Sequence, residues 1–159
     1  MYRNSNRNDF IELSVKDGSL YFKTEKLKAI SLDTLIDKDG IFIFKADQLI
    51  VKKFTDPQDS TTYNMIDNSL PTGDLFEQYS GNYSSEEAVA LIKIEKVEES
   101  LYAIITPSTK EKLTPYFRDS FRVGNKLYEF VRDNNKKIIG LYISVPRAEN
   151  IFFNKIDSK

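Results

Sequence analysis

Residues 83–113 read YSSEEAVALIKIEKVEESLYAIITPSTKEKL, and residues 2–32 read YRNSNRNDFIELSVKDGSLYFKTEKLKAISL. At a constant offset of 81 positions, both stretches carry a tyrosine, an apolar pair within an alternating segment, a turn, Leu-Tyr and a later leucine. A repeat of this size is typical of two related units in tandem, or of two halves of one closed unit. The recurring pairs are Tyr2 and Tyr83, Ile11 and Ile92, Leu13 and Ile94, Leu20 and Leu101, Tyr21 and Tyr102, and Leu32 and Leu113.

Each copy has the pattern of short β-strands joined by tight turns. Phe10–Val15 alternates apolar and polar residues, and Asp17-Gly18 after it favours a hairpin turn with positive φ. Lys137–Val145 alternates in the same way after the polar turn at 133–136. Closing such a meander removes its exposed edges. The sequence therefore predicts an all-β protein with an antiparallel up-and-down barrel, either as two small barrels or as one merged barrel.

Residues 55–72, TDPQDSTTYNMIDNSLPT, interrupt this pattern. Their Asp, Ser, Thr, Asn and Pro residues predict a connecting stretch with one short strand over Tyr63–Ile66. Thr72 or Asp74 can cap a single helical turn over Leu75–Tyr79. The expected units are therefore residues 1–70 and residues 74–159.

The composition excludes several classes of function. Net charge is −1, and neither half is basic, so we expect no nucleic-acid partner. The chain has no Cys and no His, which removes thiolate ligands, the commonest metal ligand and the commonest general base. We therefore expect no metal and no cofactor. No apolar run is long enough to span a bilayer, and the polar start MYRNSNRNDF lacks the apolar core of a signal peptide.

The order and spacing of several short elements in the second copy carry a family resemblance, although no element is specific alone. They are Phe76-Glu77-Gln78-Tyr79-Ser80-Gly81-Asn82-Tyr83, Leu101-Tyr102, Leu113-Thr114-Pro115, Asp119-Ser120-Phe121, Tyr128-Glu129-Phe130, Asp133 with Lys137-Ile138-Ile139-Gly140-Leu141, and Pro146-Arg147 with Ile151-Phe152-Phe153-Asn154-Lys155-Ile156. Together, residues 76–157 resemble the C-terminal lipocalin-like domain of serine hydrolases of the beta-lactamase and penicillin-binding-protein type. The first copy, Tyr2–Phe54, resembles a degenerate version, since it keeps Leu20-Tyr21 but lacks the Pro-Arg ending and the Gly before Tyr2.

The resemblance implies a lipocalin-like accessory barrel that packs on a catalytic domain, with the chemistry lying elsewhere. It also implies a periplasmic or extracellular location. The chain has no Ser-x-x-Lys, in which a lysine activates the serine, and no Gly-x-Ser-x-Gly. Without His, a Ser-His-Asp triad is impossible. We therefore expect no enzymatic activity.

Asp37-Lys38-Asp39-Gly40 is the one sequence that suggests a calcium loop. The further oxygen ligands and the late Glu of such a loop are missing, so the sequence predicts a turn instead.

The aromatic residues of the second copy, with one arginine, are the candidate binding residues. Inward side chains of a small barrel fill its interior, whereas those of a lipocalin line a ligand cup. Filling is the favoured interpretation, because a short barrel leaves little room. Arg147, beside Pro146, either forms a surface salt bridge, which is favoured, or meets an anionic group. The candidate pocket residues are Tyr102, Tyr116, Phe121, Tyr128, Phe130 and Arg147.

Two functions follow as expectations. The first is a non-catalytic structural or interaction module that buries an exposed apolar face against a hydrolase catalytic domain or another protein. The alternative is a lipocalin-like binder of a small apolar molecule.

Overall fold

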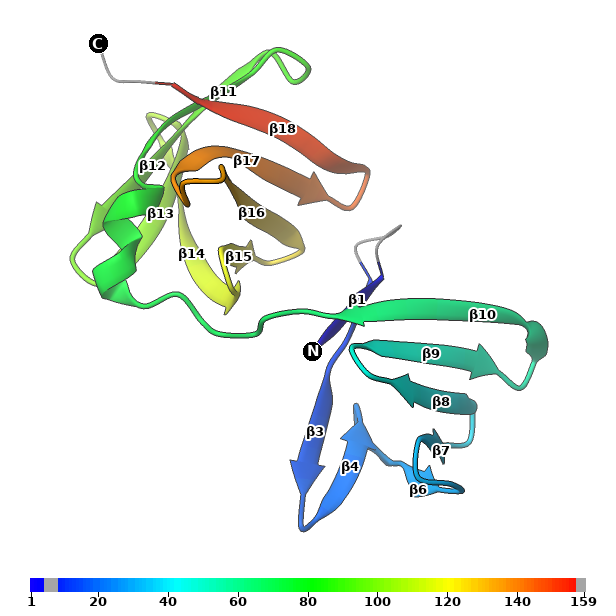
Figure 1. Ribbon diagram of the computed structural model, residues 1–159. Coiled ribbons are helices and arrows are strands. Elements are labelled where there is room, and N and C mark those ends of the chain that lie inside the picture. Colours follow the sequence, from blue (N-terminus) through cyan, green and yellow to red (C-terminus); the bar gives the residue numbers. More distant parts are fainter. Residues whose placement is uncertain (5–8, 157–159) are drawn as a thin grey trace. The chain divides into compact units, whose positions relative to one another are not determined.

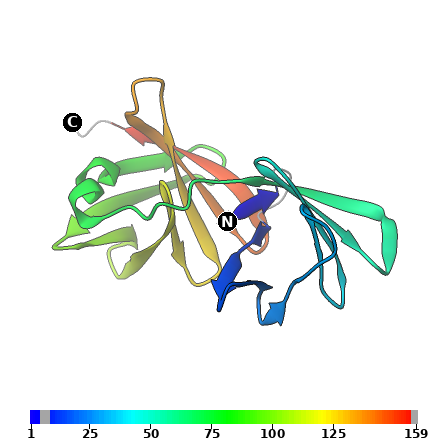
Figure 2. The ribbon, with the colours of Figure 1, turned by 60° about the horizontal axis from the view of Figure 1, so that its bottom comes forward.

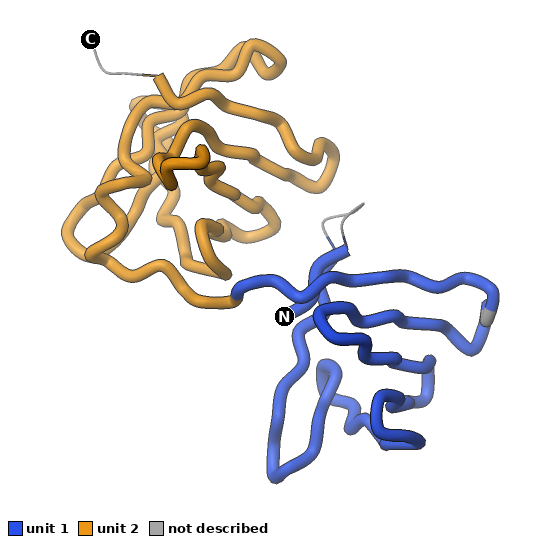
Figure 3. Tube along the Cα trace, viewed as in Figure 1, with its two compact units in different colours: residues 1–67 blue, residues 68–159 orange. Residues whose placement is uncertain are grey.

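The chain divides into two compact units, Met1–Asp67 and Asn68–Lys159 (Figure 3). The computed structural model describes residues 1–4 and 9–156. Within these residues, strands dominate and one short 3₁₀ helix, η1 (Gly73–Tyr79), precedes the second set of strands. All strand pairs are antiparallel, so the predicted all-β antiparallel fold is confirmed.

The second unit is a closed barrel of eight strands in up-and-down order (Figure 1, Figure 2). Each strand pairs with the next, and the last pairs with the first, so no edge is left free for another strand. The strands are β11 (Gly81–Ser85), β12 (Ala90–Val97), β13 (Ser100–Thr106), β14 (Thr109–Phe117), β15 (Ser120–Val123), β16 (Lys126–Arg132), β17 (Ile138–Val145) and β18 (Ala148–Ile156).

The first unit follows the same circuit with two interruptions. Its strands form the sheets β2-β1-β10-β9-β8-β7-β6 and β3-β4-β5. Only Glu12 separates β2 from β3, and only Leu27 separates β5 from β6, so the two sheets continue into each other at both ends. The strands are β1 (Tyr2–Asn4), β2 (Phe10–Ile11), β3 (Leu13–Lys16), β4 (Ser19–Phe22), β5 (Glu25–Lys26), β6 (Lys28–Ala29), β7 (Thr34–Ile36), β8 (Gly40–Lys45), β9 (Gln48–Lys53) and β10 (Asp56–Met65).

The two units also share one strand register. The offset between equivalent residues is 81 for β1 to β4, 86 for β6 to β8, 92 for β9 and 90 for β10. The chain therefore holds two copies of one strand circuit rather than one merged barrel. The second copy is a closed barrel, and the first copy, which we call the first barrel, consists of two sheets. Cross-strand pairs along the first unit have equivalent pairs in the second. The pairs, given as first unit then second unit, are Tyr2–Ile11 and Tyr83–Ile92; Leu13–Phe22 and Ile94–Ala103; Leu35–Phe42 and Phe121–Tyr128; Phe44–Leu49 and Phe130–Leu141; and Tyr2–Met65 and Tyr83–Lys155.

One of the six recurring sequence pairs is wrong. Leu32 is fully exposed, at 107 %, whereas Leu113 is buried. The residue equivalent to Leu113 is Leu27: its backbone N–H donates to Leu20 O at 2.9 Å, just as Leu113 pairs with Leu101. The first copy is five residues shorter before this leucine, so a fixed offset passes over the equivalent position.

The segment predicted as a connection is mostly strand. β10 spans ten residues, Asp56–Met65, and pairs with both β1 and β9. Hydrogen bonds on both sides and the burial of Tyr63 outweigh the weak β-propensity of its Asp and Ser residues. The strand predicted over Tyr63–Ile66 is therefore the end of a longer strand, and the prediction of a connecting stretch before it is wrong.

The other local predictions agree with the structure. Asp17 and Gly18 form a turn with φ of 49° and 69°, as the Asp-Gly signal requires. The carboxylate of Asp37 accepts the backbone N–H groups of Asp39 and Gly40, both at 2.8 Å, which makes that segment a turn. The helical turn over 75–79 is present within η1, with Thr72 at its N-cap but no side-chain cap hydrogen bond.

The cores of the two barrels use the same twelve positions. In the second barrel they are Tyr83, Ile92, Ile94, Leu101, Ala103, Leu113, Phe121, Tyr128, Phe130, Leu141, Ile143 and Phe153, and all are buried. Their counterparts, in the same order, are Tyr2, Ile11, Leu13, Leu20, Phe22, Leu27, Leu35, Phe42, Phe44, Leu49, Val51 and Tyr63. Seven of these counterparts are only partly buried. The second barrel adds Phe76 and Tyr79 of η1, and Ile138.

Candidate functional site

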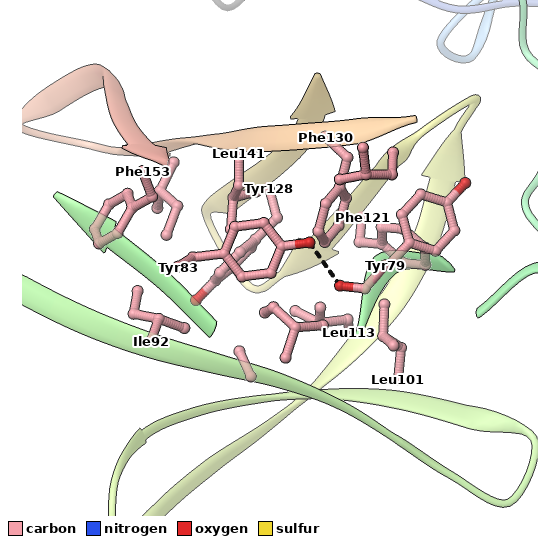
Figure 4. Close-up of a cluster of buried hydrophobic side chains, with 14 of the residues drawn as sticks. Tyr79, Tyr83, Ile92, Leu101, Leu113, Phe121, Tyr128, Phe130, Leu141 and Phe153 are labelled. Atoms are coloured by element: carbon pink, nitrogen blue, oxygen red, sulfur yellow. Dashed lines mark hydrogen bonds between the residues drawn. The ribbon is translucent and has the colours of Figure 1, made fainter. Parts of the chain in front are cut away.

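The helix η1 closes one end of the second barrel with aromatic side chains. The ring of Tyr79 lies 5.2 Å from that of Phe121 and 4.7 Å from that of Phe130. Phe76 packs edge-on against Phe121 at 5.7 Å. Figure 4 shows Tyr79, Phe121 and Phe130 gathered on one side of this core. This end of the interior is therefore occupied by the protein's own rings.

Four polar groups fix η1 in place. The hydroxyl of Tyr83 donates to the backbone carbonyl of Tyr79 at 2.7 Å (Figure 4). The hydroxyl of Tyr79 donates to Asp119 Oδ1, also at 2.7 Å. Arg132 binds the same carboxylate in bidentate fashion, through Nε at 2.9 Å and Nη2 at 2.7 Å, and its Nη1 donates to Lys136 O at 2.6 Å. The carboxylate thus joins the helix to the β14–β15 and β16–β17 ends of the barrel.

The charges of this cluster are stable at neutral pH. Burial alone would raise the pKa of the Asp119 carboxyl, but the hydrogen bonds from Arg132 and Tyr79 outweigh burial and hold that pKa below its usual range. The hydrogen bond to Asp119 raises the pKa of Arg132. All groups are engaged with one another, so the cluster positions η1 and holds no free base.

A surface hollow of about 420 Å³ lies beside this cluster. Leu70, Pro71 and Leu75 line it together with the cations Arg118 and Lys136, and Tyr79, Asp119 and Arg132 also reach it. The Arg132 guanidinium at this hollow is already bound to Asp119 and to the carbonyl of Lys136, so it is not available to an anion.

Three of the six predicted pocket residues lie together in the barrel interior. Phe121 and Phe130 form the aromatic end described above. Tyr128 is fully buried, and its hydroxyl donates to Glu111 Oε2 at 3.1 Å.

The other three predicted residues lie elsewhere. Tyr102 is only partly buried, and Lys110 Nζ lies 4.4 Å from its ring centroid. Tyr116 is also partly buried and is covered by the guanidinium of Arg122 at 3.7 Å. Arg147 is exposed in the turn between β17 and β18. The structure therefore does not gather the six residues around one pocket.

Sequence reasoning missed the residues that hold η1. The sequence predicts Tyr79 in a helical turn, but no pattern links it to Asp119 or Arg132. These residues are 40 and 53 positions from Tyr79, and only barrel closure brings them together.

An aromatic face lies on the outside of the second barrel. The rings of Tyr142 on β17 and Phe152 on β18 contact each other at 4.9 Å, and the two residues are cross-strand partners. Tyr142 is 39 % exposed, and Ile139 on the same strand is 43 % exposed. The Phe152 ring lies over Gly140, where no side chain obstructs it. We call Ile139, Gly140, Tyr142 and Phe152 the β17–β18 face.

Gly140→Ala is expected to destabilise the second barrel by about 1–3 kcal/mol, because it overpacks this face. A Cβ at Gly140 would overlap the Phe152 ring and lie 2.9 Å from the carbonyl oxygen of Phe153. Urea unfolding measures the loss. The double variant Gly140→Ala/Phe152→Leu should recover part of it, and an unchanged midpoint in the single variant would contradict the packing described.

Three of the nine tyrosines should ionise late in an alkaline titration. Burial raises the pKa of Tyr79, Tyr83 and Tyr128 well above their usual range, and the nearby carboxylates add to this for Tyr79 and Tyr128. Their neutral forms therefore stabilise the barrel fully below about pH 10, the unfolded pKa, and this stability is lost as the pH rises further. Absorbance at 295 nm should show a late cooperative step that coincides with unfolding by circular dichroism. A single non-cooperative step near pH 10 would contradict the prediction that these three tyrosines ionise late.

Comparisons with known proteins identify no family. No protein-family model matches the chain, and no curated protein matches its sequence. Across residues 1–4 and 9–156, no group of three or more Asp, Glu, Cys or His side chains could hold a metal ion. In the same part of the chain, no helix has the length and apolar character needed to cross a membrane.

Proposed function

We propose that the chain is a non-catalytic interaction module of the kind that accompanies serine hydrolases of the beta-lactamase and penicillin-binding-protein type. It packs on a catalytic domain or another protein partner through the β17–β18 face. The observation that carries the proposal is the ring pair of exposed Tyr142 and partly buried Phe152 on the outside of a barrel whose aromatic end is filled.

Aromatic side chains on a sheet surface are characteristic of protein contacts. Tyr and Phe contribute large contact areas at low cost in side-chain entropy, and they are enriched at interfaces. Gly140 lets the Phe152 ring approach the backbone of the sheet closely, so that the ring is held in place on this face. Interior packing of Tyr79, Phe121 and Phe130 favours this surface role over the alternative of a lipocalin-like ligand cup.

The proposal is tested by capture with a mechanism-based label. The immobilised full chain is incubated with extract from its source cells, and the retained proteins are treated with a fluorescent penicillin. This reagent acylates the active-site serine of such hydrolases. We expect a labelled protein to be retained by the wild-type chain and reduced about tenfold or more by Tyr142→Ser/Phe152→Ser.

The matched control is Tyr102→Ser, which removes a partly buried tyrosine elsewhere on the same barrel. This variant should retain the labelled protein. Retention of no labelled protein would contradict a hydrolase partner, and equal retention by the double variant would contradict the role of the β17–β18 face. Thermal unfolding of each variant establishes that the barrel is intact.

A further inference from the structure

The first barrel contains counterparts of four of the groups that hold Tyr79 in the second barrel, but has Ala46 at the position of Arg132. Around Tyr79, Tyr83 donates to its carbonyl, Asp119 accepts its hydroxyl, and Phe121 and Phe130 pack on its ring. At the same register positions, the first barrel has Tyr2, Asp33, Leu35 and Phe44.

The local geometry of the two sites also agrees. The backbone N–H of Phe44 donates to Asp33 O at 2.8 Å, and that of Phe130 donates to Asp119 O at 2.8 Å. The Tyr2 and Phe44 rings meet edge-on at 6.3 Å and 71°. Their counterparts in the second barrel meet edge-on at 5.8 Å and 73°. The first barrel therefore keeps the shape of a site for a helical turn.

The counterparts in the first barrel are exposed where those of the second are covered. Tyr83 and Phe121 are fully buried beneath η1, whereas Tyr2, Leu35 and Phe44 are only partly buried. These three apolar side chains therefore form an incompletely covered end of the first barrel.

The carboxylate at this end is available to a donor. Asp33 is exposed, and the hydroxyls of Ser31 and Thr34 both donate to its Oδ1, at 2.7 and 2.8 Å. Its Oδ2 can therefore accept a further hydrogen bond, as Asp119 accepts that of Tyr79. Next to it, Leu32 is fully exposed. The register counterpart of Leu32 is Arg118, which lines the hollow beside η1.

We propose that this open end of the first barrel binds a short helical turn of another protein. The turn presents an aromatic side chain and a tyrosine three residues apart, as Phe76 and Tyr79 do in η1. The tyrosine hydroxyl donates to Asp33, its ring packs on Leu35 and Phe44, and exposed Leu32 contacts the approaching segment. The helix η1 of this chain is already seated in the second barrel, so η1 itself does not supply the occupant.

The binding is measured with a peptide of residues 70–82, LPTGDLFEQYSGN, titrated into the ¹⁵N-labelled full chain. We expect saturable shifts of the amide signals of Asp33, Leu35 and Phe44. A peptide with Tyr79→Phe should bind about tenfold more weakly, because it loses a hydrogen bond to a charged acceptor. A peptide with Phe76→Ala and Tyr79→Ala should not bind.

A matched pair of variants locates the site within the chain. Asp33→Asn should weaken binding of the unmodified peptide about tenfold, whereas Asp39→Asn, which removes the same charge from the β7–β8 turn, should not.

Three results would overturn the proposal. One is the absence of shifts in the first barrel at millimolar peptide, and another is shifts confined to Phe121 and Phe130, which would mean exchange with η1. The third is binding only when the segment is fused directly ahead of Tyr2. These results are independent of the β17–β18 face, so they leave the capture experiment unaffected.

Discussion

Replacing Phe130 with alanine is expected to lower the free energy of unfolding of the second barrel by about 3–5 kcal/mol. Phe130 is buried, and its ring contacts those of Tyr79, Tyr83 and Phe121. The neighbours are held by η1 and by the closed sheet, so they cannot collapse into the space left behind. A loss of this size is a large part of the stability of a small domain.

The internal repeat provides a matched control for this variant. Phe44 is at the equivalent position in the first barrel, where it contacts Tyr2 but stays partly exposed. Phe44→Ala should therefore cost about half as much or less, because less apolar area and fewer contacts are lost. Urea unfolding followed by NMR resolves the two barrels separately. Equal losses of stability in the two barrels, or a larger loss for Phe44→Ala, would contradict the claim that this position is covered more completely in the second barrel than in the first.

Arg132→Met is expected to destabilise the second barrel by about 2–4 kcal/mol. The Asp119 side chain is 17 % exposed, and it would lose both bonds from the guanidinium while remaining charged. Breaking one side of a largely buried ion pair costs more than the pair contributes, since the remaining charge is poorly solvated. The residual hydrogen bond from Tyr79 compensates only in part.

A double-mutant cycle tests this explanation. Arg132→Met/Asp119→Asn should recover much of the lost stability, because no unpaired charge is left. Arg147→Met, in the exposed β17–β18 turn, should stay within about 0.5 kcal/mol of the wild type. Additive losses in the double variant would show that Arg132 acts through packing alone rather than through its charge.

The fold could be predicted because its signals are local. Alternation in 10–15 and 137–145 indicates strands, and Asp17-Gly18 indicates a hairpin. The repetition of this strand pattern then favours closure of the strands into a barrel. The prediction of a connecting stretch over 55–72 is wrong, because the Asp, Ser and Thr residues of β10 give no strand pattern. One partner of β10, the strand β1, lies at the other end of the first unit, and the other is the preceding strand β9.

The site could not be predicted because its contacts are long-range. Asp119 and Arg132 have no periodic signal, and their link to Tyr79 exists only after eight strands close. The open end of the first barrel also has no sequence signal, since the change of offset after Phe22 disguises the correspondence of Asp33 with Asp119.

Hydrogen exchange at two equivalent amides tests most directly whether the chain is a covered barrel and an open copy of it. The N–H groups of Phe44 and Phe130 make the same bond, at 2.8 Å, to Asp33 and Asp119. Exchange measured by NMR on the full chain should be at least tenfold slower for Phe130, because η1 covers its end of the barrel. Equal rates, or slower exchange at Phe44, would contradict the claim that η1 covers its end of the second barrel while the equivalent end of the first barrel, within residues 1–4 and 9–67, is left open.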